Sequence, residues 1–197
     1  DDILLYYLDK NKYLLVVNAA NTDKDWEWIQ DNLTEELKVK NLSDEYAQLA
    51  LQGPNSKSVL KNLTSINLEQ LQSFNFSRGK LGEVEVLISQ TGYTGEMGYE
   101  IYLPPNRAPK IWDIILEQGQ EYGIKPAGLG ARNTLRLEKK LCLYGHELSP
   151  EHHPLEAGLG WTVKFEKNID FIGCQQLWEL HQKGYPQRLT GFKMLDR

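Results

Sequence analysis

Cysteine is scarce in this 197-residue sequence, and so are several features that would indicate particular kinds of partner. Cys142 and Cys174 are too few and too far apart for a disulfide framework or a cysteine-rich zinc site, which favours a reducing cytosol or organelle matrix. No apolar run approaches the roughly 18 residues of a membrane span. Positive charge is not in excess either, because the net charge is −5. We therefore expect no nucleic-acid or membrane partner.

Motifs for metal, nucleophilic and phosphate chemistry are also missing. The sequence contains no HExxH, GxSxG, GxxxxGK[ST] or GxGxxG pattern. His146, His152 and His153 lie within eight positions, but adjacent histidines on regular structure point in different directions and cannot easily share one ion. We therefore expect no metal and no serine or cysteine nucleophile.

What is present is a mixture of strand-like and helix-like segments without regular βαβ alternation. This mixture predicts an α+β fold with mixed or antiparallel sheets and flanking helices. The strands are predicted at residues 3–8, 13–17, 44–51, 74–76, 84–88, 98–103, 124–128, 161–165 and 189–194. The helices are predicted at residues 23–33, around 59–63, and at 108–120, 131–139 and 172–182.

The stretch Gly92–Glu100, GYTGEMGYE, lies between two of these strands. Three glycines in seven residues favour a tight turn with accessible main-chain groups. Such a turn would hold Tyr93 and Glu100 at the edge of a rigid sheet, where binding groups are often found. A plain hairpin with a mobile tip is the alternative reading.

A few polar residues interrupt apolar structure or lie at its edges. Asp2 precedes one strand of the predicted hairpin and Asn18 follows the other, so pairing of these strands would bring the two side chains together. Glu100 interrupts an apolar strand, and Arg132 lies in the first turn of a helix, where a carboxylate is more usual. Glu100 could pair structurally with an arginine. It could also accept hydrogen bonds from a neutral heterocycle, with Arg132 contacting an acidic tail or a ring carbonyl.

Several motifs in a fixed order resemble the aminomethyltransferase family, the T-protein of the glycine cleavage system. They are DDILLYYL, LLVVNAANTDKDWEW, YAQLALQGPNS, GYTGEMGYE, GLGARNTLRLEKKLCLYGHEL and HPLEAGLGWTVK. The resemblance covers nearly the whole chain. Because family members continue before Asp1 and have a C-terminal barrel beyond Arg197, the chain is expected to be a middle fragment that is inactive alone.

The resemblance implies a tetrahydrofolate-dependent transferase of the bacterial cytoplasm or the mitochondrial matrix. Its partner is the lipoylated H-protein, from whose aminomethyl group it releases ammonia while forming 5,10-methylenetetrahydrofolate. Matched position by position, the catalytic aspartate is Asp2. The folate-binding residues are Tyr6, Asn18, Tyr93, Glu100 and Arg132. No metal is implied.

The resemblance also implies subdomains. Residues 44–139 would form a first, ferredoxin-like subdomain containing the glycine-rich turn, and residues 1–43 and 140–197 parts of a second. Asn133 stands where the family usually has aspartate, which predicts a looser hold on Arg132. The rival readings are a folate-binding relative, namely a dimethylglycine or sarcosine dehydrogenase C-terminal region or an iron–sulfur assembly factor, and a scaffold without a ligand.

Overall fold

The computed structural model describes residues 1–167 and 169–195. The chain divides into two compact units. We call residues 26–141 the sheet unit, and residues 1–25 together with 142–197 the hairpin unit. Helix α1 (Thr22–Asp31) includes the boundary between them. The subdomain boundaries expected from the family resemblance concern the complete protein and stay a prediction.

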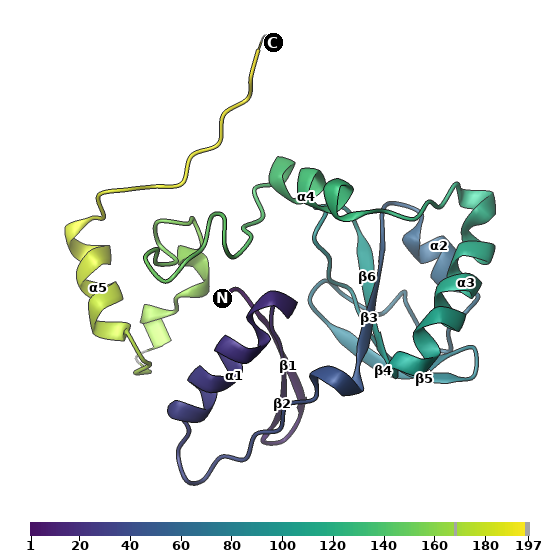
Figure 1. The fold of residues 1–197 in the computed structure, drawn as a ribbon, viewed down its shortest axis with the longest axis horizontal. Helices are drawn as coiled ribbons and strands as arrows, with labels where there is room; N and C mark the ends of the chain where they lie inside the picture. The colour runs from purple at the N-terminus through teal and green to yellow at the C-terminus, as the bar shows by residue number, and fades with distance from the viewer. Residues whose placement is uncertain (168, 196–197) are drawn as a thin grey trace. The chain divides into compact units, whose positions relative to one another are not determined.

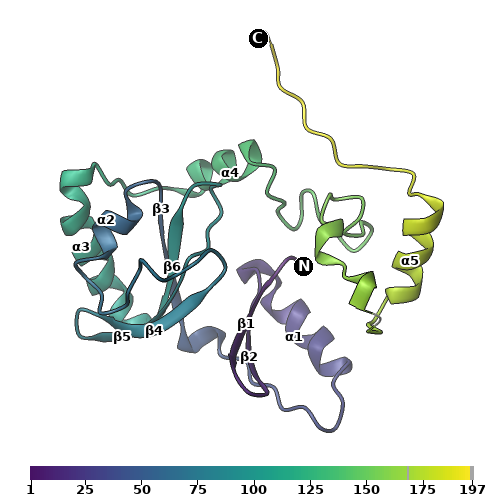
Figure 2. The ribbon, with the colours of Figure 1, turned by 180° about the vertical axis from the view of Figure 1, so that it is seen from behind.

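The sheet unit is built on a four-stranded antiparallel sheet with strand order β3-β6-β5-β4. Two helices, α2 and α3, pack together against this sheet (Figures 1 and 2). The strands are β3 (Ala47–Gln52), β4 (Phe76–Leu81), β5 (Val84–Ser89) and β6 (Gly98–Leu103), and the helices are α2 (Ser56–Leu60), α3 (Ala108–Gly119) and α4 (Leu129–Glu138).

The side chains of β6 alternate between the core and the opposite face of the sheet. Tyr99, Ile101 and Leu103 are completely buried and belong to the hydrophobic core that also contains Leu60 and Ile111. Complete burial of such a side chain contributes about 1.5–3 kcal/mol relative to its exposure. Because successive side chains of a strand point to opposite faces, Glu100 lies on the face away from this core.

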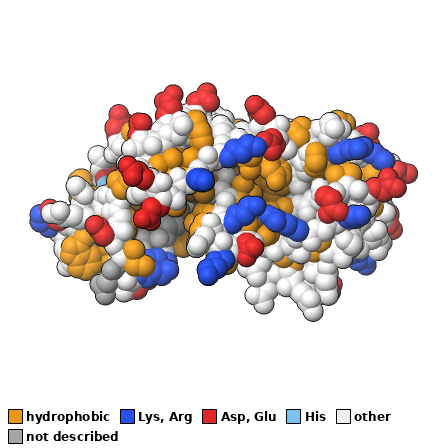
Figure 3. Space-filling model, turned by 90° about the horizontal axis from the view of Figure 1, so that it is seen from below, with side chains coloured by type: hydrophobic (Ala, Val, Ile, Leu, Met, Phe, Trp, Pro, Cys, Tyr) orange, Lys and Arg blue, Asp and Glu red, His pale blue; other side chains and the backbone are white. Residues whose placement is uncertain are grey.

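The hairpin unit contains strands β1 (Leu4–Asp9) and β2 (Lys12–Val16), which pair antiparallel, and helix α5 (Cys174–Lys183). Asn11 in the connecting turn has φ of 59°, a left-handed conformation that asparagine tolerates better than most residues. Tyr6 is buried, whereas Tyr7 and its cross-strand partner Tyr13 are exposed, with ring centroids 5.4 Å apart. Hydrophobic side chains reach the surface in several places, as Figure 3 shows for one face.

The predicted α+β class is confirmed, and four of the predicted helices, α1, α3, α4 and α5, occur within two residues of their expected ends. Three predicted strands are wrong. Residues 124–128 are not a strand, because the Ile124 amide donates to Gly119 O at the end of α3 and Pro126 has no amide hydrogen. Residues 161–165 are not a strand either, because this segment begins in a short 3-10 helix in which Thr162 N donates to Leu159 O.

Residues 189–194 are the third wrong strand, since they have no strand pairing in this structure. The strand expected at residues 74–76 is displaced. Phe74 has φ of 61°, which is incompatible with a strand, so β4 begins at Phe76 and extends to Leu81. Within the described ranges, no helix is both long enough and apolar enough to cross a bilayer.

Candidate functional site

Glu100 lies on the face of the sheet opposite the hydrophobic core, on the same face as the buried Tyr102 and Leu87. It pairs with Ala50 of β3 on one side and with Ser89 of β5 on the other, so two neighbouring strands flank it. Its side chain is partly exposed. The pairing of β6 with both neighbouring strands therefore fixes the position of the Glu100 backbone. Its location within a strand, rather than in a mobile loop, agrees with the prediction from the sequence.

Both carboxylate oxygens of Glu100 accept hydrogen bonds from neutral groups. Gln48 Nε2 donates to Oε1 at 2.7 Å, and the Thr91 hydroxyl donates to Oε2. Ser89 Oγ lies 2.7 Å from Thr91 Oγ1 and extends this cluster into the buried sheet. Among the described residues no cation forms an ion pair with Glu100, so pairing with an arginine is not its role here. A carboxylate has about four acceptor positions, which leaves capacity for a donor-rich ligand.

Tyr93 and Arg132 form a second contact in the sheet unit. Tyr93 follows Gly92 in the glycine-rich turn, and Arg132 lies in the first turn of α4, where its amide donates to Gly128 O. The Arg132 guanidinium carbon lies 4.2 Å from the Tyr93 ring centroid, which is cation–π geometry. Since Arg132 is exposed, its donors are accessible to an anionic or carbonyl group.

Asn133 contacts another arginine of α4, and its expected effect on Arg132 stays a prediction. Its Oδ1 accepts a hydrogen bond from Arg136 Nε at 2.8 Å, and Arg136 is the buried residue of α4. This contact supports α4 from within.

In the hairpin unit, Asn18 joins the two aspartates at the start of the chain. Its Nδ2 donates to Asp2 Oδ1 at 3.0 Å and also to Asp1 Oδ1, while its main-chain amide donates to Asp1 Oδ2 at 3.0 Å. Pairing of β1 with β2 therefore brings Asp2 and Asn18 together, as predicted. Tyr6 lies on the buried side of β1 with its neighbours Leu5 and Tyr7 exposed.

Sequence reasoning missed the residues that support the predicted ones. Gln48 and Gln52 recur four positions apart in the otherwise apolar β3, and this spacing places them on one face of a strand. That signal was readable in the sequence. The contributions of Thr91 and Asp1 depend on contacts made in the folded chain, and no local pattern indicated them.

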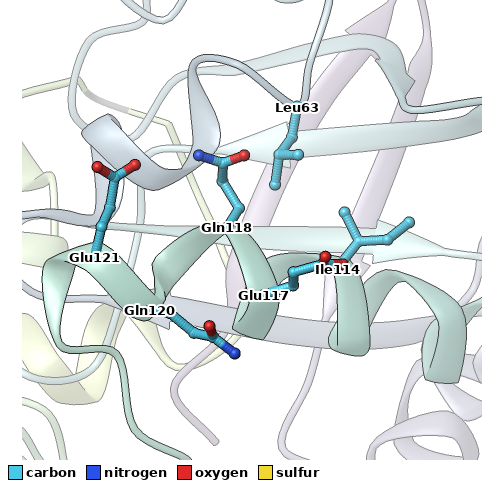
Figure 4. Close-up of a pocket in the computed structure, with 6 residues that line it drawn as sticks. All are labelled: Leu63, Ile114, Glu117, Gln118, Gln120 and Glu121. Atoms are coloured by element: carbon cyan, nitrogen blue, oxygen red, sulfur yellow. The ribbon is translucent and has the colours of Figure 1, made fainter.

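Metal ligation has no support in the described part of the chain, where no group of three or more His, Cys, Asp and Glu residues could hold an ion. One surface groove of about 550 Å³ lies in the sheet unit, along α3 (Figure 4). Its lining is polar and acidic and includes none of the predicted site residues. It consists of Leu63, Ile114, Glu117, Gln118, Gln120 and Glu121.

The fold defines an α+β protein in which a carboxylate on the sheet is held by neutral donors and keeps capacity to accept hydrogen bonds from a further donor. The family model described as "GCVT N-terminal domain" matches residues 1–167, so the chain belongs to that family. It is 53% identical to an aminomethyltransferase of Halothermothrix orenii over all of its residues and 55% of that relative. The chain thus spans about half the length of the curated relatives it matches.

Solved structures agree with this family. The structure of glycine cleavage system aminomethyltransferase T from Bartonella henselae superposes with a TM-score of 0.79 and 29% identity, over 93% of this chain and 49% of that one. The heterotetrameric sarcosine oxidase of Corynebacterium sp. U-96 gives a TM-score of 0.51 at 21% identity, over 64% of each chain, and shows the fold alone. The dehydrogenase-like and iron–sulfur alternatives are not favoured.

Proposed function

We propose that the complete protein containing this chain is a tetrahydrofolate-dependent aminomethyltransferase of the glycine cleavage system. It would take the aminomethyl group carried on the lipoyl arm of the H-protein, release ammonia and form 5,10-methylenetetrahydrofolate. Membership of the GCVT family and the names of its relatives support this function. Because the chain spans about half of those relatives, we expect it to contribute to the folate pocket rather than to turn over alone.

The observation that carries the proposal is the set of neutral donors around Glu100. Gln48 and Thr91 orient both oxygens without neutralising the carboxylate. A pterin has an exocyclic amine and a ring N–H on one edge, which a carboxylate can accept side by side. We therefore assign the pterin ring to Glu100. An arginine at the same place would have neutralised the charge that such a ligand requires.

Arg132 and Tyr93 supply the complementary chemistry. The pterin and the rest of folate also present carbonyl and carboxylate oxygens, for which an exposed guanidinium is a suitable donor. The contact between Arg132 and the Tyr93 ring keeps the long arginine side chain in one orientation. This lowers the conformational entropy that binding would otherwise cost.

Asp2 is the proposed catalytic residue, supported by Asn18 and with Tyr6 as a further folate-contacting residue. In this reaction the methylene carbon loses its bond to the amine, which leaves as ammonia, and its bond to the lipoyl sulfur, which leaves as a thiol. The carbon forms bonds to two folate nitrogens, whose protons pass to the two leaving groups, so positive charge develops near the reacting amine. A nearby carboxylate stabilises such charge and can accept or return a proton. Asn18 Nδ2 donates a hydrogen bond to Asp2 Oδ1, so Asn18 would help to orient the catalytic carboxylate. No metal is needed for this step, because the aminomethyl carbon becomes electrophilic as ammonia leaves.

Steady-state kinetics of Asp2→Asn in the complete protein, with the aminomethylated H-protein as donor, tests this role. We expect kcat to fall by about 100-fold or more, while the dissociation constant for folate changes little. Asp9→Asn at the other end of β1 is the matched control and should leave both unchanged. Equal losses of turnover and folate affinity in Asp2→Asn would show that Asp2 only binds.

A further inference from the structure

Gln52, the last residue of β3, occupies the inside of the glycine-rich turn. Its Nε2 donates to Thr91 O at 3.2 Å and to Tyr99 O at 3.3 Å. Its Oε1 accepts from Thr94 Oγ1 at 3.3 Å. Thr91 precedes the turn and Tyr99 follows it, so one side-chain amide links both ends of the turn and its middle.

The same side chain explains two of the three glycines. Neither Gly92 nor Gly98 has a positive φ, so backbone conformation does not require glycine at either position. A Cβ atom at Gly92 or Gly98 would overlap with the amide group of Gln52. Only Gly95 has the left-handed conformation that favours glycine, with φ of 72°. The glycines at 92 and 98 thus make room for Gln52.

Other contacts attach the turn to the segment that follows β3. Gly53 N donates to Met97 O at 2.8 Å, and Ser56 Oγ lies 3.4 Å from the same oxygen. These bonds hold the end of the turn that leads into Glu100. The beginning of the turn, which carries Tyr93, is held at Thr91 O by the amide of Gln52, and the same amide also bonds to Tyr99 O beside Glu100. Without that amide, Thr91 O and Tyr99 O would lose the hydrogen-bond donor that they share.

We propose that Gln52 is a positioning residue for folate binding, because its amide fixes Tyr93 and Glu100 in the arrangement that the pterin requires. The inference rests on the proposed function. Thr91 is also the residue whose hydroxyl donates to Glu100, so Gln52 supports the carboxylate through Thr91 O on one side and Tyr99 O on the other. Gln52 itself need not touch the ligand.

The test is calorimetric titration of 5-formyltetrahydrofolate into the complete protein and its Gln52→Met variant. Methionine has a similar volume but cannot form the three hydrogen bonds, so packing is largely kept. We expect binding about tenfold weaker, with an unchanged circular dichroism spectrum. Gln118→Met on α3 is the matched control and should bind like the wild type.

The outcomes separate the two proposals. Lack of binding by the folded wild type would overturn the proposed function, and this inference with it. Saturable wild-type binding that Gln52→Met retains in full would overturn only the inference.

A double-mutant cycle with Gly92→Ala and Gln52→Ala distinguishes positioning from packing. Gly92→Ala alone should lower the melting temperature, because the new methyl group collides with Gln52. In the double variant this collision is absent, so we expect the melting temperature to recover in part while folate affinity stays about tenfold low. Additive melting temperatures would contradict the contact, and recovery of affinity would contradict positioning by hydrogen bonds.

Discussion

The sheet unit and the hairpin unit differ in how completely they bury their apolar side chains. In the sheet unit, the core residues Leu60, Ile88 and Ile101 have no exposed surface. In the hairpin unit, Leu5 on β1 is 60% exposed, and α5 has no buried residue. The candidate residues of the sheet unit are therefore supported by a hydrophobic core within that unit. Those of the hairpin unit belong to a hairpin that has apolar side chains exposed on one face.

This difference has a physical consequence for the candidate residues of each unit. A two-stranded hairpin is marginally stable without further strands or a helix to cover it. Apolar side chains that remain in water contribute little to folding free energy. Since the curated relatives are about twice as long as this chain, the complete protein has further residues that could cover the exposed face of β1 and β2. We expect Glu100 to be ordered in this chain and Asp2 to gain order in the complete protein.

The largest expected effect compares one apolar residue from each unit. Ile101→Ala removes a completely buried side chain from the centre of β6 and should lower the free energy of unfolding of the sheet unit by about 3 kcal/mol. Leu5→Ala changes an exposed position and should cost less than about 0.5 kcal/mol. Urea denaturation of the 197-residue chain measures both. Similar losses in the two variants would contradict the comparison.

A smaller effect concerns Tyr99, whose hydroxyl is buried without a hydrogen-bond partner in the described structure. Tyr99→Phe should therefore raise the free energy of unfolding by up to about 1 kcal/mol or leave it unchanged. Burial raises the pKa of Tyr99 above its ordinary value of about 10. The unfolded chain thus loses this proton first as pH rises, and the stability contributed by neutral Tyr99 is present below pH 10 and lost above it.

Melting temperatures of the wild type and Tyr99→Phe between pH 8 and pH 11 check this effect. The wild type should lose stability more steeply than the variant above about pH 10. Parallel curves would show that Tyr99 does not titrate differently in the folded and unfolded states.

The local sequence pattern was sufficient to predict those helices and strands whose own residues show the expected hydrophobic periodicity. The hairpin, β5, β6 and α3 follow from alternation or helical spacing. The position of Phe74 was not predictable in this way, because its left-handed backbone lies in a turn closed by the bond from Asn75 N to Gln72 O, and its own amide donates to the distant Gln90 O. Residues 161–165 have a strand-like pattern, but Trp161 is 67% exposed and no neighbouring strand pairs with the segment.

The candidate site shows the same limit. Glu100 was predictable because a carboxylate inside an apolar strand is unusual, and Asn18 because both ends of a hairpin meet. The donors to Glu100 depend on the order β3-β6-β5, which joins segments far apart in sequence. Neither propensity nor periodicity specifies that order, so the hydrogen bonds of Gln48 and Thr91 to Glu100 could be recognised only in the folded chain, although the spacing of Gln48 and Gln52 was readable in the sequence.

The central claim is that Glu100 binds the pterin of folate, and calorimetric titration of 5-formyltetrahydrofolate into Glu100→Gln of the complete protein tests it most directly. The amide retains the shape of the carboxylate but lacks its charge and one acceptor oxygen, so we expect affinity to fall about 10- to 100-fold. Glu96→Gln, which alters an exposed carboxylate of the same turn 3.6 Å from Lys139 Nζ, should bind like the wild type. Undiminished binding by Glu100→Gln would contradict the account.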